Sequence, residues 1–206
     1  MEELLSNINH IVVVGAWNKE IFTDEWVRKN ILNDVEKYSI EYPISGPGSL
    51  RYLTDDFSFF IVPGRLLLNL NKSTDYASKI AVEYIRRILR LLSHTPVEAM
   101  GINFVFKKIG RLDVFNGLSD MELLSMSIAK PCMASEVTRH FQLTDNETLN
   151  FTVSQKEDDI KFDFNFNYNA HLPIDCLNVL GDENNIIIDK RQEALKIIND
   201  VYEINK

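Results

Sequence analysis

Residues 159–170 alternate between apolar and polar side chains almost without interruption. The apolar positions are Ile160, Phe162, Phe164, Phe166 and Tyr168, and the polar positions are Lys161, Asp163, Asn165, Asn167 and Asn169. Successive side chains of a β-strand point to opposite faces of a sheet, so this two-residue period predicts a strand. We expect its aromatic face to be buried in the core and its amide-rich face to be solvated.

The segments that precede this strand have the same period and predict an antiparallel meander over residues 136–169. Cross-strand partners must lie on the same face of a sheet, and this condition limits the register. We expect Phe151 to lie opposite Phe162, and Leu143 to lie opposite Leu149.

The same register predicts a row of polar side chains on the solvated face of the meander. It places His140 next to Thr152, with Lys161 on the other side of Thr152. A row of this kind contains groups that could transfer a proton. Because the solvated face of an antiparallel sheet is normally polar, we interpret the row as surface. The sequence leaves open whether these three side chains do more.

The remaining segments predict further strands and amphipathic helices. N-capping residues followed by apolar stripes of helical period predict one helix that follows Thr23 and ends near Tyr38, and another that follows Ser73 or Thr74. Asp189 is expected to cap a C-terminal helix. Further strands are expected at 10–17, 50–55, 57–62, 65–71, 97–107 and 186–188, and a further helix at 118–130.

Together these elements predict the α+β fold class. We expect a mostly antiparallel sheet, ending in a C-terminal three-stranded meander, that packs against three to four helices. The length of 206 residues suits one large domain or two small ones with a shared core. Because no Ser/Gly-rich or charge-rich linker divides the chain, we expect a single body over 1–206. Two lobes, at about 1–110 and 111–206, are the alternative.

Composition and charge favour an ordinary globular protein without nucleic-acid partners. Apolar residues make up 45% of the chain and charged residues 25%, as in typical soluble domains. The formal net charge is −8, whereas nucleic-acid-binding proteins usually carry a basic surface.

The sequence also favours a cytoplasmic location and no contact with a membrane. The longest apolar run, 11–17, is too short to span a bilayer, and the acidic start of the chain differs from a secretory signal peptide. Cys132 and Cys176 both have apolar neighbours, and we expect buried, reduced thiols.

Motifs for catalysis, cofactors or metals are absent from the sequence. It contains no GxSxG motif, and residues 45–49 lack the Lys-Ser/Thr of a phosphate-binding loop. The histidines are scattered, without another His or Cys within a helical turn: His10, His94, His140 and His171. We therefore expect no metal and no cofactor, and we favour a protein that is not an enzyme.

Two groups of polar side chains are candidates for partner binding. They are a stripe of cations on the second predicted helix and two amides of the last strand: Lys79, Arg86, Arg87, Arg90, Asn165 and Asn167. Cations over three helical turns could contact phosphate or an acidic partner. Glu83 interrupts the stripe and can pair with Arg87, so a solvated helix face is the simpler interpretation.

Residues 66–106 combine a strand ending in Asn, a long helix, and a second strand that opens with Gly-Ile-Asn-Phe at 101–104. This pattern resembles a sporadically distributed bacterial family of uncharacterised α+β proteins. The resemblance covers about a fifth of the chain. It implies the fold and a patchy distribution like that of mobile or defence-linked genes, and it implies no site residues.

These observations favour a non-catalytic protein-interaction or assembly module of a bacterial or phage cytoplasmic system, with a second copy or another protein as its partner. The alternative is an enzyme or small-molecule-binding protein with a cleft between two lobes. A third hypothesis is nucleic-acid recognition through the cationic stripe. An open sheet edge would favour the module, whereas ionisable side chains buried in a concave pocket would favour the enzyme.

Overall fold

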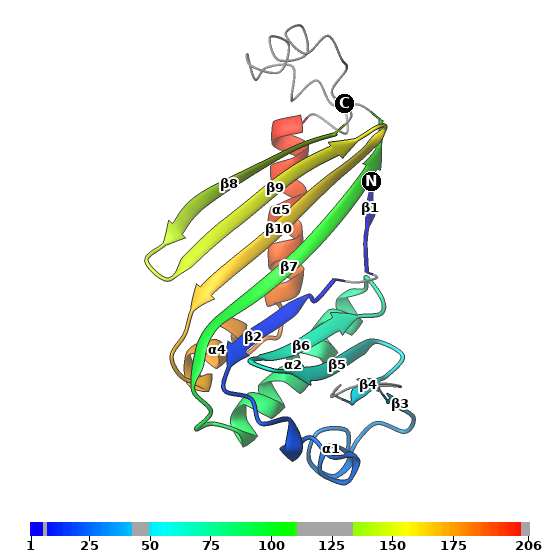
Figure 1. Cartoon of the computed structure of the whole chain (residues 1–206), viewed down its shortest axis with the longest axis vertical. Coiled ribbons are helices and arrows are strands. Elements are labelled where there is room, and N and C mark those ends of the chain that lie inside the picture. The colour runs from blue at the N-terminus through cyan, green and yellow to red at the C-terminus, as the bar shows by residue number, and fades with distance from the viewer. Residues whose placement is uncertain (6–7, 43–49, 111–133, 203–206) are drawn as a thin grey trace, which may run out of the picture.

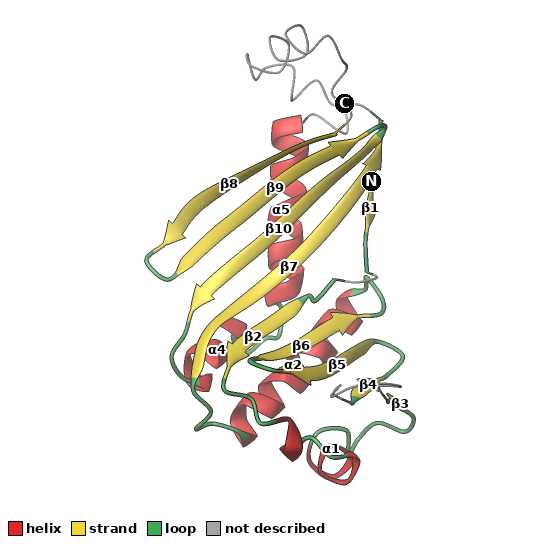
Figure 2. Ribbon diagram, in the orientation of Figure 1, coloured by secondary structure: helices red, strands yellow, loops and turns green. Residues whose placement is uncertain are grey.

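The structure is a computed structural model that describes residues 1–5, 8–42, 50–110 and 134–202. Its strands form one antiparallel sheet, and helices cover one face of that sheet (Figure 2). This confirms the α+β class. The strands are β1 (Glu2–Glu3), β2 (Ile11–Gly15), β3 (Ser39–Glu41), β4 (Arg51–Leu53), β5 (Phe57–Val62), β6 (Arg65–Leu70), β7 (Val97–Ile109), β8 (Ala134–Thr144), β9 (Glu147–Lys156) and β10 (Asp159–Asn169). The helices are α1 (Asp24–Asn30), α2 (Asp75–Leu91), α4 (Pro173–Leu180) and α5 (Ile186–Tyr202), with a short 3-10 turn, η1 (Lys19–Ile21).

The sheet consists of a short-stranded half and a long-stranded half (Figure 1). The strand order is β3-β4-β5-β6-β2-β7-β10-β9-β8, and β1 also pairs with β7. Strands β7 to β10 have 10 to 13 residues, whereas β2 to β6 have 3 to 6. Since β10 pairs with β7 from one end to the other, the two halves of the chain share one sheet.

The aromatic face of β10 lies in the core, as the alternation predicts. Its apolar side chains are at most 6% exposed: Ile160, Phe162, Phe164, Phe166 and Tyr168. Helix α5 runs behind the long strands, and its Tyr202 ring lies 5.1 Å from that of Phe162. The predicted meander is confirmed as β8-β9-β10.

The predicted register of the meander is wrong by two residues, although the predicted faces are right. Phe151 lies opposite Phe164, and Phe162 lies opposite Val153. The cause is the hairpin turn, which is centred one residue later than expected and leaves Glu157 in the left-handed region with φ 55°. Moving a turn by one residue shifts every cross-strand pair by two and preserves the face.

The β8–β9 hairpin also differs from the prediction by two residues, for a different reason. Leu149 lies opposite Phe141, and the pairing of Thr144 with Glu147 leaves Leu143 in an irregularity of the ladder. The turn is one residue shorter than expected, because Thr144 pairs with Glu147 across residues 145 and 146, and the bulge adds one unpaired residue to β8; together they shift the partner of Leu149 from Leu143 to Phe141.

Three predicted helical features need correction. Helix α1 ends at Asn30 rather than near Tyr38. The Ile31 carbonyl accepts a hydrogen bond from Arg87 of α2 instead of continuing the helix, and the chain turns there. Residues 186–188 form the first turn of α5 and not a strand, so the cap expected at Asp189 does not exist. Helix α4 was not predicted, and the expected helix at 118–130 lies outside the described residues.

Candidate functional site

A row of hydrogen-bonded polar side chains crosses the face of the sheet that the helices leave open. Asn103 on β7 donates to the carbonyl of Asn9 at 2.6 Å and accepts from Asn165 on β10 at 2.6 Å. Asn165 in turn accepts from Asn150 on β9 at 2.7 Å. The Asn150 Oδ1 lies 2.7 Å from Nδ1 of His140 on β8. We call Asn103, Asn165, Asn150 and His140 the amide row.

Every hydrogen bond of the amide row has the same direction. Because the Asn150 Nδ2 donates to Asn165, its Oδ1 is the group that accepts from His140. In the neutral His140 ring the proton therefore lies on Nδ1, and Nε2 is an acceptor at the exposed end of the row. The row orients one imidazole at the edge of the sheet.

The amide row replaces the predicted row of His140, Thr152 and Lys161. Thr152 lies between Thr138 and Asp163, its hydroxyl 2.9 Å from that of Thr138, and Lys161 lies opposite Ser154. The prediction fails because the register is shifted by two residues, which exchanges the cross-strand partners and keeps the face. Asn165, a predicted partner-binding residue, is a half-buried member of the row. Asn167 lies on the same face and is half-buried as well.

The cationic stripe on α2 is not one solvated face. Arg86 is 4% exposed, and its guanidinium lies 2.8 Å from the Asp182 carboxylate and 3.3 Å from the Asn184 amide. Helix α2 contacts strand β6 and the helices α4 and α5, and the loop between α4 and α5 covers Arg86. Glu83 accepts from Asn184 at 3.2 Å, so it also belongs to the contact with the α4–α5 loop.

Arg87 is held by the turn that follows α1. Its guanidinium lies 2.9 Å from the Asp34 carboxylate, and this hydrogen bond is the main reason why the pKa of Asp34 is lowered to about 2. Lys79 and Arg90 are exposed. A role in partner binding stays a prediction for these four cations, and within this fold Arg86 and Arg87 already hold neighbouring loops in place.

The outermost long strand, β8, forms one edge of the sheet. Within the described residues no strand pairs with its outer side. Phe141 and Leu143 of β8 are 45% and 39% exposed. Large exposed apolar side chains on a sheet edge favour association with another chain. Strand β10 lies between β7 and β9 and is internal to the sheet.

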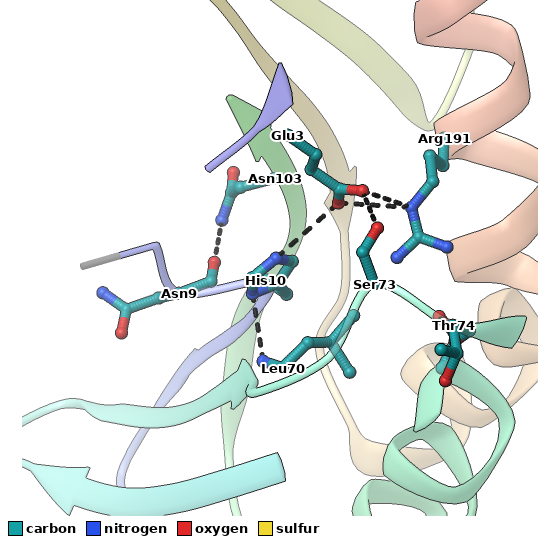
Figure 3. Close-up of polar contacts among 9 residues, drawn as sticks. Glu3, Asn9, His10, Leu70, Ser73, Thr74, Asn103 and Arg191 are labelled. Atoms are coloured by element: carbon teal, nitrogen blue, oxygen red, sulfur yellow. Dashed lines mark hydrogen bonds and ion pairs between the residues drawn. The ribbon is translucent and has the colours of Figure 1, made fainter. Parts of the chain in front are cut away.

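A second polar assembly lies on the covered face, where β1, β2, α5 and the start of α2 meet (Figure 3). The Glu3 carboxylate lies 3.0 Å from Arg191 Nε, accepts from the Ser73 hydroxyl, and lies 3.9 Å from His10 Nε2. His10 is completely buried, and the Glu3 and Arg191 side chains are 8% and 9% exposed. We call these four residues the Glu3 cluster.

Burial and charge keep His10 neutral. Desolvation, the largest cause, and the nearby Arg191 charge together lower the pKa of His10 to about 4, against the opposing effect of the Ile8 backbone. The His10 Nδ1 accepts from the Leu70 backbone N–H at 3.1 Å, so its proton lies on Nε2, which faces Glu3.

The Glu3 cluster does not have the arrangement of a Ser-His-acid triad. A triad needs the imidazole to touch the nucleophilic hydroxyl and the acid to orient the imidazole from behind. Here the Glu3 carboxylate lies between Ser73 and His10, and the imidazole is closed to solvent. Sequence reasoning missed this cluster because 188 positions separate Glu3 from Arg191, and no local pattern links them.

Other chemistry-bearing groups give no site within the described residues. There, no three His, Cys, Asp or Glu side chains are grouped so as to hold a metal ion. Cys176 is buried as predicted, and desolvation raises the pKa of its thiol to about 12, so it is not a thiolate at neutral pH. Cys132 lies outside the described residues.

No family model, curated protein or solved structure matches the chain. In the described part of the chain, none of the helices has the length and apolar character needed to cross a membrane.

Proposed function

We propose that the chain is a non-catalytic protein-interaction module that associates through the outer edge of β8. The observation that carries this proposal is an 11-residue strand at the end of the sheet with two exposed apolar side chains, Phe141 and Leu143. Edge strands present unpaired backbone groups, and proteins that remain monomeric usually protect them with charges, proline or short length.

The partner that we propose for this edge is a second copy of the chain. Two β8 strands related by a two-fold axis run antiparallel, which is the direction that the rest of the sheet already uses. The segment 136–144 contains one Glu and one Arg, so its net charge is zero, whereas the whole chain carries −8. Two copies of this segment therefore do not repel each other through a net charge. The association would cover Phe141 and Leu143 against the partner.

The amide row supports the same surface. It ends at His140 on β8, and its half-buried amides are already hydrogen-bonded to one another. A face whose polar groups are paired with one another ties the edge strand to its neighbours and offers little to a small substrate. The enzyme hypothesis has one supporting feature, the Glu3 cluster, and the burial of His10 argues against it.

The test is the oligomeric state of two matched double variants. Phe141→Lys/Leu143→Lys places charges on the edge, whereas Leu172→Lys/Ile174→Lys places the same charges at α4, where the two side chains are 49% and 53% exposed. We expect the wild type and the α4 variant to sediment as dimers at micromolar concentration, and the β8 variant to sediment as a monomer with an unchanged circular dichroism spectrum.

The second copy is contradicted as the partner if the wild type remains monomeric in sedimentation velocity at concentrations up to about 100 μM. A dissociation constant of about 100 μM corresponds to an association free energy of about −5.5 kcal/mol. Equal dissociation of both double variants would contradict β8 as the surface. The link to bacterial or phage systems depends on the resemblance over 66–106 and stays a prediction.

A further inference from the structure

The Glu3 cluster contains more hydrogen-bond donors than its carboxylate satisfies. Arg191 Nε and the Ser73 hydroxyl bind the Glu3 oxygens. His10 Nε2 is 3.9 Å away, beyond hydrogen-bond length. Within the described residues His10 Nε2 and Arg191 Nη2 are both buried without a partner. Buried donors are nearly always paired in folded proteins, so two in one cluster require an explanation.

We propose that this cluster is a binding site for a tetrahedral oxyanion, either free phosphate or the phosphate of a monoester, and that the Glu3 carboxylate is its displaceable occupant. This site is separate from the β8 edge and does not depend on the function proposed above.

The donors have the chemistry that phosphate recognition uses. A guanidinium binds phosphate oxygens through two N–H groups at once, and Arg191 now uses only its Nε on Glu3. The neutral His10 ring presents an N–H, because its Nδ1 is occupied by the Leu70 N–H. A carboxylate offers two oxygens in a plane, whereas a phosphate offers three or four in a tetrahedron, enough to reach all of these donors.

The position in the fold adds positive potential to the site. Ser73 directly precedes Thr74, the N-cap of the 17-residue helix α2 (Figure 3). The positive end of a helix dipole favours an anion, and backbone N–H groups near it are common phosphate ligands. Arg191 is the cationic member of the cluster, and Glu3 is its ion-pair partner within the described residues.

The occupant is attached by a short segment. Strand β1 has two residues, and its pairing with β7 consists of Glu2 opposite Lys107 and Glu3 opposite Phe106, followed by one hydrogen bond from Leu4. Two-residue strands contribute little on their own and open readily. Release of this segment would move the Glu3 carboxylate into solvent and leave Arg191, His10 and Ser73 for the incoming oxyanion. Ser73 is exposed and marks the entrance.

The experiment measures inorganic phosphate binding to the full chain by isothermal titration calorimetry and thermal unfolding, at constant ionic strength maintained with chloride. The variants are wild type, Glu3→Ala, and Glu3→Ala/Arg191→Met. We expect Glu3→Ala to bind phosphate at least tenfold more tightly than the wild type, because no occupant has to be displaced. At ten times its dissociation constant, phosphate should raise the Tm of Glu3→Ala by roughly 3 °C. The double variant should not respond.

Acetate at the same concentrations distinguishes a phosphate site from a simple carboxylate slot. If acetate stabilises Glu3→Ala as much as phosphate does, the cluster is a structural ion pair and the proposal is wrong. The proposal is also wrong if phosphate neither binds Glu3→Ala nor raises its Tm. It is wrong as well if the Glu3→Ala/Arg191→Met double variant binds phosphate as tightly as Glu3→Ala does. If Glu3→Ala does not fold, Glu3→Gln takes its place: its neutral amide still occupies the site but holds Arg191 less strongly, so phosphate should bind it more tightly than it binds the wild type, and an affinity no higher than that of the wild type overturns the proposal. The sedimentation of the β8 variants is unaffected by any of these outcomes.

Discussion

The two faces of the long-stranded half hold their polar groups in different ways. On the covered face the Glu3 cluster combines a carboxylate from β1, a guanidinium from α5 and a neutral imidazole from the residue before β2. On the open face the amide row consists of neutral side chains on adjacent strands. Charges under the helices need an exact opposite charge nearby, because desolvation is costly there.

The difference shows what determines the hydrogen-bond partners of the polar side chains on each face. A residue in the amide row finds its partner on the neighbouring strand, so the register alone determines the row. A residue in the Glu3 cluster finds its partner only when the N-terminus, β2 and the C-terminal helix are all in place. The amide row on the open face therefore depends only on the pairing of neighbouring strands. The Glu3 cluster on the covered face forms only when distant segments of the chain have folded together.

Removal of an aromatic side chain from the covered face should have the largest effect. The Phe164 ring is completely buried and lies 4.5 Å from that of Phe151 and 6.1 Å from that of Phe106. We expect Phe164→Ala to lower the free energy of unfolding by about 3–5 kcal/mol, from lost apolar burial and the cavity left behind. Urea denaturation measures the loss. A loss below that of Asn165→Ala on the open face would contradict the assignment of the two faces.

The titration of His10 should have the next largest effect. The folded state holds the pKa of His10 at about 4, below the ordinary value of 6.5. Between these values the unfolded chain binds the extra proton and the folded chain does not, so stability falls as the pH is lowered from 6.5 to 4 and then levels off. The loss should total about 3 kcal/mol.

The matched control is His10→Asn, which keeps an acceptor for the Leu70 N–H and has no titrating ring. Urea midpoints of wild type and variant, measured at steps between pH 7 and pH 4, separate His10 from the carboxylates that also titrate. If the two proteins lose stability in parallel over this range, His10 is not held neutral by the fold.

Sequence periodicity predicted the faces of the meander correctly, because parity depends only on the alternation of side chains. It could not predict the register, which depends on which residue adopts the left-handed conformation in the turn, here Glu157. The slip of two residues in the β9–β10 hairpin kept Phe162 and Phe151 on one face, and the separate slip in the β8–β9 hairpin gave His140 the wrong partner.

The failures elsewhere have tertiary causes. Arg86 has a helical position that periodicity assigns to solvent, and the α4–α5 loop covers it. The Ile-rich residues 186–188 favour a strand by composition, whereas the buried Ile187 and Ala194 show that packing against the sheet selects a helix. The Glu3 cluster has no local signal, since its members meet only in the folded chain.

The smallest predicted effect concerns the amide row and tests whether it is more than a solvated surface. In Asn165→Ala, the Asn150 Nδ2 loses its acceptor and the Asn103 Oδ1 loses its donor, both in half-buried positions. We expect a loss of about 1–2 kcal/mol, which is less than for Phe164→Ala because water can reach part of the row. The control is Asn167→Ala on the same strand and face. Its amide makes no hydrogen bond to a described residue, so a change of at most about 0.5 kcal/mol is expected.

Nitrogen chemical shifts of His140 provide a second readout, because loss of Asn165 frees the Asn150 amide to rotate and should reduce the fraction of the Nδ1–H form. Equal stability of the two alanine variants, with an unchanged His140 tautomer, would show that the four side chains act independently.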